Sequence, residues 1–539
     1  MPFAVSRLPL ALCLILLGAP ALAAQSLPTS DPILQRIWQE GVDRSQADIL
    51  AQALMDSVGP RLVGAPGMKR GSDWAIAMYG SWGIPARAEA YGSWKGWQRG
   101  LAHLDLVAPR ERSLEGGPLA WSMGTNGRPV EGPVVTLPVV ADSAAFAEWL
   151  RTARGKYVAI SFPQPTCRPD ADWEAFAGGD PRTAAIGRRF GAGPLRTAFH
   201  RMRAARTAAD SAWRARLVAS GMPENALREA LGTAGAAGIL TSAWAQGYGT
   251  AQVFDARTDK APVYWLSCED YGLVARLAER NQGPRLRATS TARFTGDAQA
   301  INTVAEIRGS AKPTEYVVLS AHFDSWDGAS GATDNGTGSI VMMEAMRILK
   351  AVHPHPTRTI IAGHWDSEEQ GLNGSRAFAA DHPEIVNGMQ ALFNQDNGTG
   401  RVASVSALGL LGTSEALGRW FTKLPDELKR DFRLDLPGSP SGGGTDHASF
   451  ICAGAPAVGL NSEPWDYFSY TWHTNRDTYD KVAMENVRDN AVLVAMLAYL
   501  AAEDPETVSR DQRVLGVNRR TGGQAEWPAC EPPDRAYSR

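Results

Sequence analysis

The sequence predicts an α/β fold, in which helices sandwich a mixed, mostly parallel β-sheet and a smaller β-rich domain is inserted. Three observations lead to this prediction. Strands alternate with helices from residue 300 to 505, and short strand-like runs crowd the region from about 130 to 295. The 539 residues, 44% hydrophobic and 21% charged, are enough for two or three domains.

The chain begins with a pattern that is typical of a secretory signal peptide. Arg7 precedes the apolar run LPLALCLILLGAP, and Ala21-Leu22-Ala23 follows as a small-x-small cleavage pattern. We therefore expect residues 1–24 to be removed and the mature protein to be periplasmic or secreted. The apolar run is too short to span a bilayer, and no later run is long enough, so we expect no membrane span.

The segments after the signal predict a catalytic domain that is interrupted by the insertion. Residues 25–110 form its first part, because DPILQRIWQEGVDRSQADILAQAL has helical spacing before GPRLVGAPG breaks it. Residues 111–295 form the inserted domain, with a helical insertion near 168–233. Its expected strands lie at 132–140, 156–162, 238–242, 262–267 and 286–294.

Within the helical insertion, the Ala/Arg-rich stretch 193–220 predicts a surface helix. Its arginines would suit an anionic partner, but a solvated helix face is the interpretation that we favour.

Residues 296–505 predict the main part of the catalytic domain. Its strands are expected at 315–321, 359–365, 391–395 and 455–462, and its helices from about 337 and at 485–502. The polar, proline-containing tail, 506–539, is expected to be poorly ordered.

Charge and cysteine usage exclude several classes of function. The formal net charge of −3 gives no general attraction to nucleic acid. Four cysteines follow the signal segment, and in an oxidising compartment they allow three complete pairings, which the sequence leaves open. None of them forms a C-x-x-C pair, so the sequence does not favour a cysteine-bound zinc.

Acidic residues and histidines gather where the predicted catalytic strands end. Ligands bind at the carboxyl ends of strands in such sheets. Two histidines with several carboxylates suit zinc or a similar divalent ion, and two ions sharing one carboxylate would compensate so many acids. The candidate residues are His322, Asp324, Asp334, Glu368, Glu369, Asp396 and His473.

The other histidines are interpreted more simply. His364 lies within a predicted strand and is expected to be structural, whereas His447, in GGGTDHASF, lies in a loop whose glycines could approach a ligand. The remaining five are expected to be structural or on the surface: His103, His200, His353, His355 and His382.

Taken in order, these motifs resemble one known family. They are similar to the motifs of the co-catalytic dinuclear zinc peptidases, which include leucyl aminopeptidases and glutamate carboxypeptidases. The matching motifs are H-x-D at 322–324, ATDNGTG, SEEQG, Asp396 after a strand and HTNRDT. Within them, the sequence most resembles the plasma glutamate carboxypeptidase group, and the resemblance covers roughly residues 45–505. It implies a zinc-peptidase fold of the phosphorylase/hydrolase-like type and a protease-associated character for the inserted domain.

The resemblance also implies roles for single residues. One zinc would take His322 and Asp396, the other Glu369 and His473, with Asp334 bridging the two ions. Glu368 would be the general base, and Asp324 would steady His322. The same resemblance implies a cis peptide bond between Asp334 and Asn335.

Substrate-binding residues are less clearly implied. Several relatives have Tyr or His before the last zinc histidine, where this sequence has Trp472, whose indole N–H can only donate. Tyr467 or Tyr470 could substitute for it in stabilising the oxyanion, so that role stays open. The glycine-rich loop adds Gly443, Asp446 and His447 as candidates for contact with substrate.

The function predicted from the sequence is therefore a secreted or periplasmic dinuclear zinc exopeptidase that acts on dipeptides or short peptides. Two alternatives are a non-catalytic receptor of the same fold, which loss of metal ligands would mark, and a single-zinc glutaminyl cyclase-like enzyme. The sequence leaves open the preferred side chain, the terminus that is recognised, and whether the chain forms a homodimer.

Overall fold

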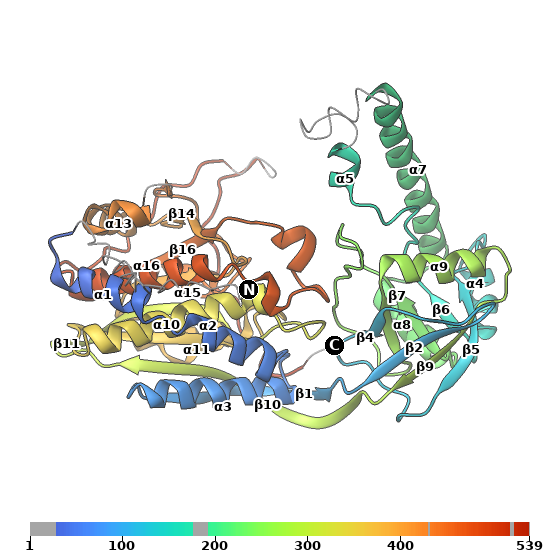
Figure 1. Cartoon of the computed structure of the whole chain (residues 1–539), viewed down its shortest axis with the longest axis horizontal. Coiled ribbons are helices and arrows are strands. Elements are labelled where there is room, and N and C mark those ends of the chain that lie inside the picture. The colour runs from blue at the N-terminus through green and yellow to red at the C-terminus, as the bar shows by residue number, and fades with distance from the viewer. Residues whose placement is uncertain (1–28, 176–191, 430–431, 518–521, 538–539) are drawn as a thin grey trace, which may run out of the picture.

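The structure, a computed structural model, consists of two domains that lie side by side (Figure 1). It describes residues 29–175, 192–429, 432–517 and 522–537, so the proposed signal segment 1–24 lies outside the described residues. Among the described residues, no helix combines the length and the apolar character that crossing a bilayer requires.

The first domain is built on an eight-stranded mixed sheet. Its central strands β12, β11, β13 and β16 run parallel, whereas β10 is antiparallel to both β1 and β12. This arrangement confirms the predicted α/β class. In sheet order the strands are β1 (Ala86–Gln98), β10 (Arg293–Ile307), β12 (Arg358–Trp365), β11 (Lys312–His322), β13 (Met389–Gln395), β16 (Ala457–Ser462), β14 (Val402–Ser406) and β15 (Arg433–Asp435).

Helices cover both faces of this sheet, because its central strands are apolar on both sides. In β11, Val317 and Leu319 belong to one buried cluster while Val318 belongs to another on the opposite face. The first cluster packs under α1 (Pro32–Asp43), α2 (Ala47–Gln52), η1 (Ala53–Val58), α3 (Pro66–Ser81), α10 (Thr337–Val352), α13 (Leu411–Lys423), α14 (Asp426–Lys429) and α16 (Met484–Glu503). The second packs under α11 (Asn373–Asp381), α12 (Pro383–Asn387) and α15 (Ala448–Ile451).

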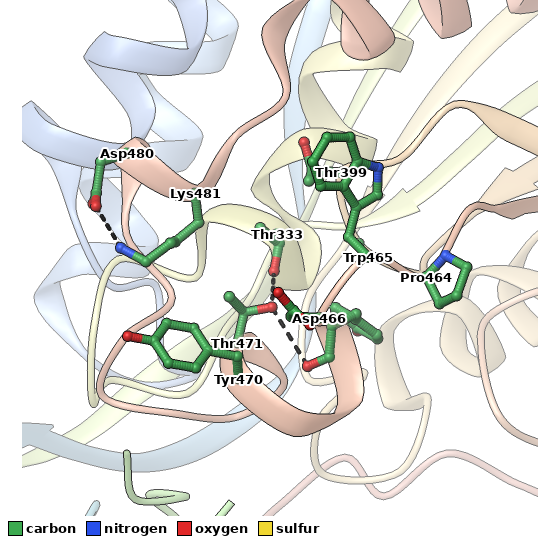
Figure 2. Close-up of a pocket in the computed structure, with 11 residues that line it drawn as sticks. Thr333, Thr399, Pro464, Trp465, Asp466, Tyr470, Thr471, Asp480 and Lys481 are labelled. Atoms are coloured by element: carbon green, nitrogen blue, oxygen red, sulfur yellow. Dashed lines mark hydrogen bonds and ion pairs between the residues drawn. The ribbon is translucent and has the colours of Figure 1, made fainter. Parts of the chain in front are cut away.

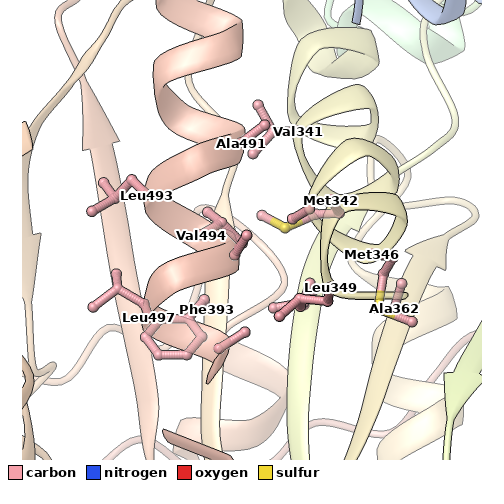
Figure 3. Close-up of a cluster of buried hydrophobic side chains, with 14 of the residues drawn as sticks. Val341, Met342, Met346, Leu349, Ala362, Phe393, Ala491, Leu493, Val494 and Leu497 are labelled. Atoms are coloured by element: carbon pink, nitrogen blue, oxygen red, sulfur yellow. The ribbon is translucent and has the colours of Figure 1, made fainter. Parts of the chain in front are cut away.

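The contact between α10 and α16 lies at the centre of the first apolar cluster. Met342 and Leu349 of α10 face Val494 and Leu497 of α16, above Phe393 of the sheet (Figure 3). Burying a side chain of this size stabilises the fold by about 1.5–3 kcal/mol. The two helices therefore fix the sheet edge from which the loops of the candidate site emerge.

The second domain is an insertion with its own eight-stranded sheet. In sheet order its strands are β3 (Arg112–Ser113), β2 (Ala102–Ala108), β9 (Arg285–Ser290), β5 (Val130–Thr136), β6 (Tyr157–Ala159), β7 (Gly238–Thr241), β8 (Val263–Leu266) and β4 (Gly116–Pro118). Its helices are α4 (Ser143–Arg151), α5 (Asp170–Glu174), α7 (Ala192–Ala219), α8 (Glu224–Thr233) and α9 (Cys268–Glu279). The long helix α7 projects away from this sheet, and it covers the stretch that was expected to be helical (Figure 1).

One predicted domain boundary is wrong. The inserted domain was expected to start at residue 111, but β2 (Ala102–Ala108) already pairs with β9 of the second sheet. This pairing joins segments that lie far apart in the sequence, so no local pattern reveals it. The boundary follows the long strand β1, which pairs with β10 along the connection between the two domains.

The expected poor order of the tail is also wrong for its described residues, 506–517 and 522–537. Trp527 packs against the second apolar cluster and its indole N–H donates to the carbonyl of Ile451. A disulfide joins Cys452 to Cys530, and another, Cys167–Cys268, lies within the inserted domain. The tail is thus fixed by tertiary contacts that its own polar sequence does not reveal.

A buried ion-pair network ties α1 to α10, and we predict that it contributes strongly to stability. Arg347 lies 2.5 Å from Glu40 and 2.8 Å from Glu344, whereas Arg44 meets the same Glu40 from an exposed position at 3.0 Å. Arg347→Met should lower the free energy of unfolding by about 3–5 kcal/mol, because the buried Glu344 loses its cation and Glu40 keeps only the exposed Arg44.

The control is Arg44→Met, which should cost only about 0–1 kcal/mol because Arg44 is exposed. Urea unfolding of both variants provides the comparison. Equal losses of stability in the two variants would contradict the prediction that the buried ion pairs contribute more to the free energy of unfolding than the exposed one.

Candidate metal centre

The candidate site lies at the carboxyl ends of the parallel strands of the first sheet. His322 is the last residue of β11, Asp396 follows β13 directly, and Glu368 and Glu369 follow β12. Parallel strands end at the same edge of a sheet, so these side chains converge. His473 reaches the same place from the loop after the short turn η4 (Tyr467–Thr471).

The acidic and histidine side chains form two groups that share Asp334. In the first group, His322 Nε2 lies 2.9 Å from Asp396 Oδ1 and 3.4 Å from Asp334 Oδ1. In the second group, His473 Nε2 lies 2.8 Å from Glu369 Oε2 and 3.2 Å from Asp334 Oδ2. Asp334 thus presents one carboxylate oxygen to each group.

Asp334 lies in the short turn η3 (Ala332–Gly336), between β11 and α10. The peptide bond between Asp334 and Asn335 is cis, which confirms the expectation drawn from the family resemblance. The two carboxylate oxygens of Asp334 face two different histidines, His322 and His473.

Asp324 organises the site in a way that differs from the simple expectation. The Nδ1 atom of His322 is 3.0 Å from the backbone carbonyl of Asp324 and 3.5 Å from its carboxylate. That carboxylate instead accepts the backbone N–H groups of Glu368, at 3.0 Å, and Glu369, at 3.3 Å. Asp324 therefore orients His322 and both glutamates at once, through different atoms.

The electrostatics of the site call for a compensating cation. Burial raises the pKa of Glu369 well above its ordinary value, and the neighbouring Asp334 raises it further. Burial also raises the pKa of Glu368 well above its ordinary value. The charge of His322 lowers this pKa, whereas the charge of Asp396 raises it further. Burial lowers the pKa of His473 and so favours the neutral imidazole that binds metals.

The donor atoms of the site fit a bound metal. Oε1 of Glu369 and Oδ2 of Asp334 are buried and have no hydrogen-bond partner among the described residues. Two imidazoles with carboxylates, and no thiolate, form a donor set that zinc accepts. The residues that the sequence singled out as ligands are therefore brought together in a suitable geometry.

Two supporting residues were not identified from the sequence. The carboxylate of Asp477 accepts the backbone N–H groups of Thr333, at 2.7 Å, and Asp334, at 3.0 Å. Burial raises the pKa of Asp477 to about 7, and the charge of Asp334 contributes to the rise. Asp477 lies within HTNRDT, so the motif was recognised but this residue's role within it was not.

The second supporting residue, Arg61, comes from the early segment GPRLVGAPG. Its fully buried guanidinium donates to the carbonyls of Phe323 at 2.6 Å, Ser330 at 2.8 Å and Gly331 at 2.9 Å. Burial lowers its pKa to about 10, while nearby aspartates raise it. Arg61 thus shapes the loop that joins β11 to Asp334.

The inserted domain contributes directly to the site. Val253 N–H donates to the carbonyl of His473 at 2.8 Å, and the Phe254 ring meets the His473 ring edge-on with centroids 5.3 Å apart. Asn475 exchanges hydrogen bonds with the backbone of Ala251 on the same loop. The position of one candidate metal ligand is therefore set by both domains.

The expected substrate-binding residues are distributed unevenly around the site. Trp472 stacks on His473 with centroids 4.0 Å apart, so it lies next to the second group. Tyr470 lines a separate pocket of about 300 Å³ with Thr333 and Trp465 (Figure 2). The Tyr467 hydroxyl lies beside Asp334 and helps to lower the pKa of that carboxyl, against the effect of burial.

The three candidate substrate-binding residues of the glycine-rich loop differ in their surroundings. Asp446 is buried near the first group, and burial raises its pKa to about 7 despite the opposing charge of His322. Burial lowers the pKa of His447 to about 4, and neither ring nitrogen has a hydrogen-bond partner among the described residues. Gly443 has space around it and makes no contact that assigns it to a substrate.

His364 is structural, as expected. Its Nε2 lies 2.7 Å from the Tyr79 hydroxyl, and burial lowers its pKa to about 3. It stays in the core behind the strand and does not join either group.

Comparisons with known proteins identify relatives of this chain among the peptidases. The family model for Peptidase family M28 matches residues 302–498. Carboxypeptidase Q of Rattus norvegicus is 26% identical over 457 residues, which cover 85% of each chain. Carboxypeptidase Q of Mus musculus is 29% identical over 259 residues, which cover 48% of this chain and 54% of the mouse protein, about half its length.

Solved structures share the fold. A peptidase M28 precursor from Shewanella amazonensis matches with a TM-score of 0.61 at 21% identity, covering 88% of this chain and 97% of that chain. A zinc aminopeptidase from Bacillus subtilis matches with a TM-score of 0.51 at 17% identity, covering 86% and 96%.

These matches confirm the predicted relation to the plasma glutamate carboxypeptidase group and the predicted peptidase class. The chain therefore contains a domain, residues 302–498, that matches Peptidase family M28, and it is homologous to carboxypeptidase Q.

Proposed function

We propose that the chain is a dinuclear zinc exopeptidase that hydrolyses dipeptides or short peptides. The observation that carries this proposal is the pair of ligand groups that share Asp334. His322 and Asp396 would hold one zinc, Glu369 and His473 the other, and Asp334 would bridge them.

The chain's own residues supply the proton transfer. When bound, two zinc ions would provide Lewis acidity for the attacking water and for the scissile carbonyl. Glu368 would take a proton from that water and deliver it to the leaving amine, because its carboxylate is aimed at the site without belonging to either ligand group. Its Oε2 lies 4.0 Å from His322 Nε2, and Asp324 fixes its backbone.

The two alternative functions receive less support. A receptor that has lost catalysis would lack metal ligands, whereas both ligand groups and Glu368 are present here. A single-zinc enzyme would leave the second group, with Glu369 and His473, without a role. The two disulfides favour an oxidising compartment, and with the predicted signal segment they support a periplasmic or secreted protein.

We predict that two zinc ions bind to each chain. Protein saturated with zinc and freed of excess metal should contain about two equivalents by atomic emission analysis, and chelation should abolish dipeptide hydrolysis. Asp334→Asn should lower the zinc content at both positions, because Asp334 faces both groups.

Glu384→Gln provides the matched control, since this carboxylate is exposed and lies on α12, away from the site. A fully active enzyme that retains a single equivalent would refute the dinuclear proposal.

Changing each of the adjacent glutamates to glutamine should lower activity for a different reason. Glu369→Gln should reduce zinc content, and excess zinc should restore part of the activity. Glu368→Gln should keep both ions and lower kcat by about 10²–10⁴-fold, because an amide cannot accept the proton. Zinc stoichiometry and kcat are measured on the same preparations, and loss of zinc from Glu368→Gln would show that the two roles are assigned wrongly.

The inserted domain should limit substrate size, because its loop contacts His473 and Asn475 at the site. Cleavage rates should fall as peptides lengthen, with folded proteins resistant. The measurement is a series of peptides of increasing length with free and blocked termini. Internal cleavage of folded proteins at the rate of dipeptides would show that the insertion does not restrict access.

A further inference from the structure

An aromatic pocket opens beside the candidate metal centre. It has a volume of about 470 Å³ and reaches Glu369, a proposed zinc ligand, and Gln370. The amide atoms of Gln370 are buried and have no hydrogen-bond partner among the described residues. The aromatic side chains that line it are Trp94, Trp121, Phe254, Trp326 and Tyr537. They come from both domains and from the tail.

The rings of this aromatic pocket support one another. Trp326 contacts Phe254 with centroids 5.4 Å apart and Trp121 at 6.2 Å. Tyr537 contacts both Trp94 and Trp121 at 5.7 Å. Such edge-on and tilted contacts hold aromatic side chains in place with little freedom. The pocket is therefore preformed, and the tail supplies one of its walls.

Several anchors bring the tail to the pocket. The disulfide Cys452–Cys530 fixes its base, and Asp534 N–H donates to Asn373 Oδ1 at 2.8 Å. Arg535 pairs with Asp381 at 2.7 Å, and its carbonyl accepts the N–H of Ser93 in β1 at 2.8 Å. The end of the chain accordingly lies between the two domains (Figure 1).

A glycine in β1 permits this close approach. A Cβ atom at Gly92 would lie 2.2 Å from the carbonyl oxygen of Arg535, far inside van der Waals contact. Any side chain there would push the tail away from β1. Gly92 thus provides a way to displace Tyr537 without changing the pocket's own aromatic residues.

We propose that the tail forms a wall of the substrate pocket and that Tyr537 is a specificity-determining residue. This inference rests on the proposed peptidase function. The pocket would take a large apolar or aromatic side chain next to the scissile bond, because aromatic rings line it together with Glu369. Acidic side chains would be disfavoured, since Asp255 and Asp534 also line it and Arg257 is paired with Asp255 at 3.0 Å.

The test compares Tyr537→Ala with Tyr537→Phe, which keeps the ring, and with Val514→Ala, an exposed tail position. The substrates are dipeptides with Phe, Leu, Ala or Glu at each position. For Tyr537→Ala, kcat/KM should fall about tenfold for Phe and Leu substrates, mainly through KM. Alanine substrates should change by less than about twofold, and zinc content should stay the same.

A uniform change for all side chains would overturn the proposal, and so would a general rise in activity, which would mark the tail as a plug. Binding of free phenylalanine and alanine, followed by calorimetry, gives a second readout that needs no turnover. Tyr537→Ala should weaken phenylalanine binding and leave alanine binding unchanged. If the wild-type enzyme hydrolyses no dipeptide but keeps this selective binding, the proposed function fails while the pocket assignment stands.

Gly92→Ala provides an independent test through the backbone. It should reproduce the loss of selectivity of Tyr537→Ala, and the double variant should lose no more than either single variant, because both act on the same wall. Gly418→Ala on α13 is the control, since a Cβ there would have no described atom within 4 Å apart from its chain neighbours and the adjacent backbone of its own helix. Normal selectivity in Gly92→Ala, or full additivity in the double variant, would overturn the proposal.

Discussion

The structure depends on one electrostatic constraint: several carboxylates are buried together around two histidines. Glu368, Glu369 and Asp396 all have raised pKa values, chiefly because burial disfavours their charged forms. Desolvated acids at such close range are tolerated only when cations or hydrogen bonds compensate them. Bound divalent cations would compensate the charge of these carboxylates, and the same closely spaced carboxylates would then bind the cations tightly.

The backbone around the site is arranged to meet that constraint. Two carboxylates outside the ligand groups, Asp324 and Asp477, each accept two backbone N–H groups, of which one belongs to a candidate ligand residue and the other to the residue before it. The buried guanidinium of Arg61 then binds the carbonyls of the loop between β11 and Asp334. Ligand positions are therefore set by backbone hydrogen bonds rather than by flexible side chains, which is the preorganisation that a metal site requires.

The sequence predicted the parts of the molecule that local patterns determine. The candidate ligands His322, Glu369 and Asp396 lie at or just after ends of predicted strands, so chain order alone brings them to one edge of the sheet. Strand and helix alternation likewise predicted the fold class. The same reasoning placed His364 in the core, because it lies within a strand.

Features that depend on distant pairings could not be predicted in this way. The boundary at β2 depends on its pairing with β9, and the order of the tail depends on the Cys452–Cys530 disulfide and on the space above Gly92. The roles of Asp477 and Arg61 depend on which backbone groups they meet after folding. Each was visible in a quoted motif, but a motif does not show the partner.

The aromatic pocket, which we propose sets substrate specificity, also depends on contacts between segments that are distant in the sequence. Its rings come from β1, the inserted domain, the loop after β11 and the tail, and they are spread along the sequence from Trp94 to Tyr537. The ligand groups lie mainly on one domain, whereas the pocket exists only where two domains and the tail meet. Changes in the tail can therefore alter side-chain preference while the metal ligands keep their geometry. Catalytic chemistry and selectivity would then be separable properties of this chain, one fixed by the sheet edge and the other by the contact between its parts.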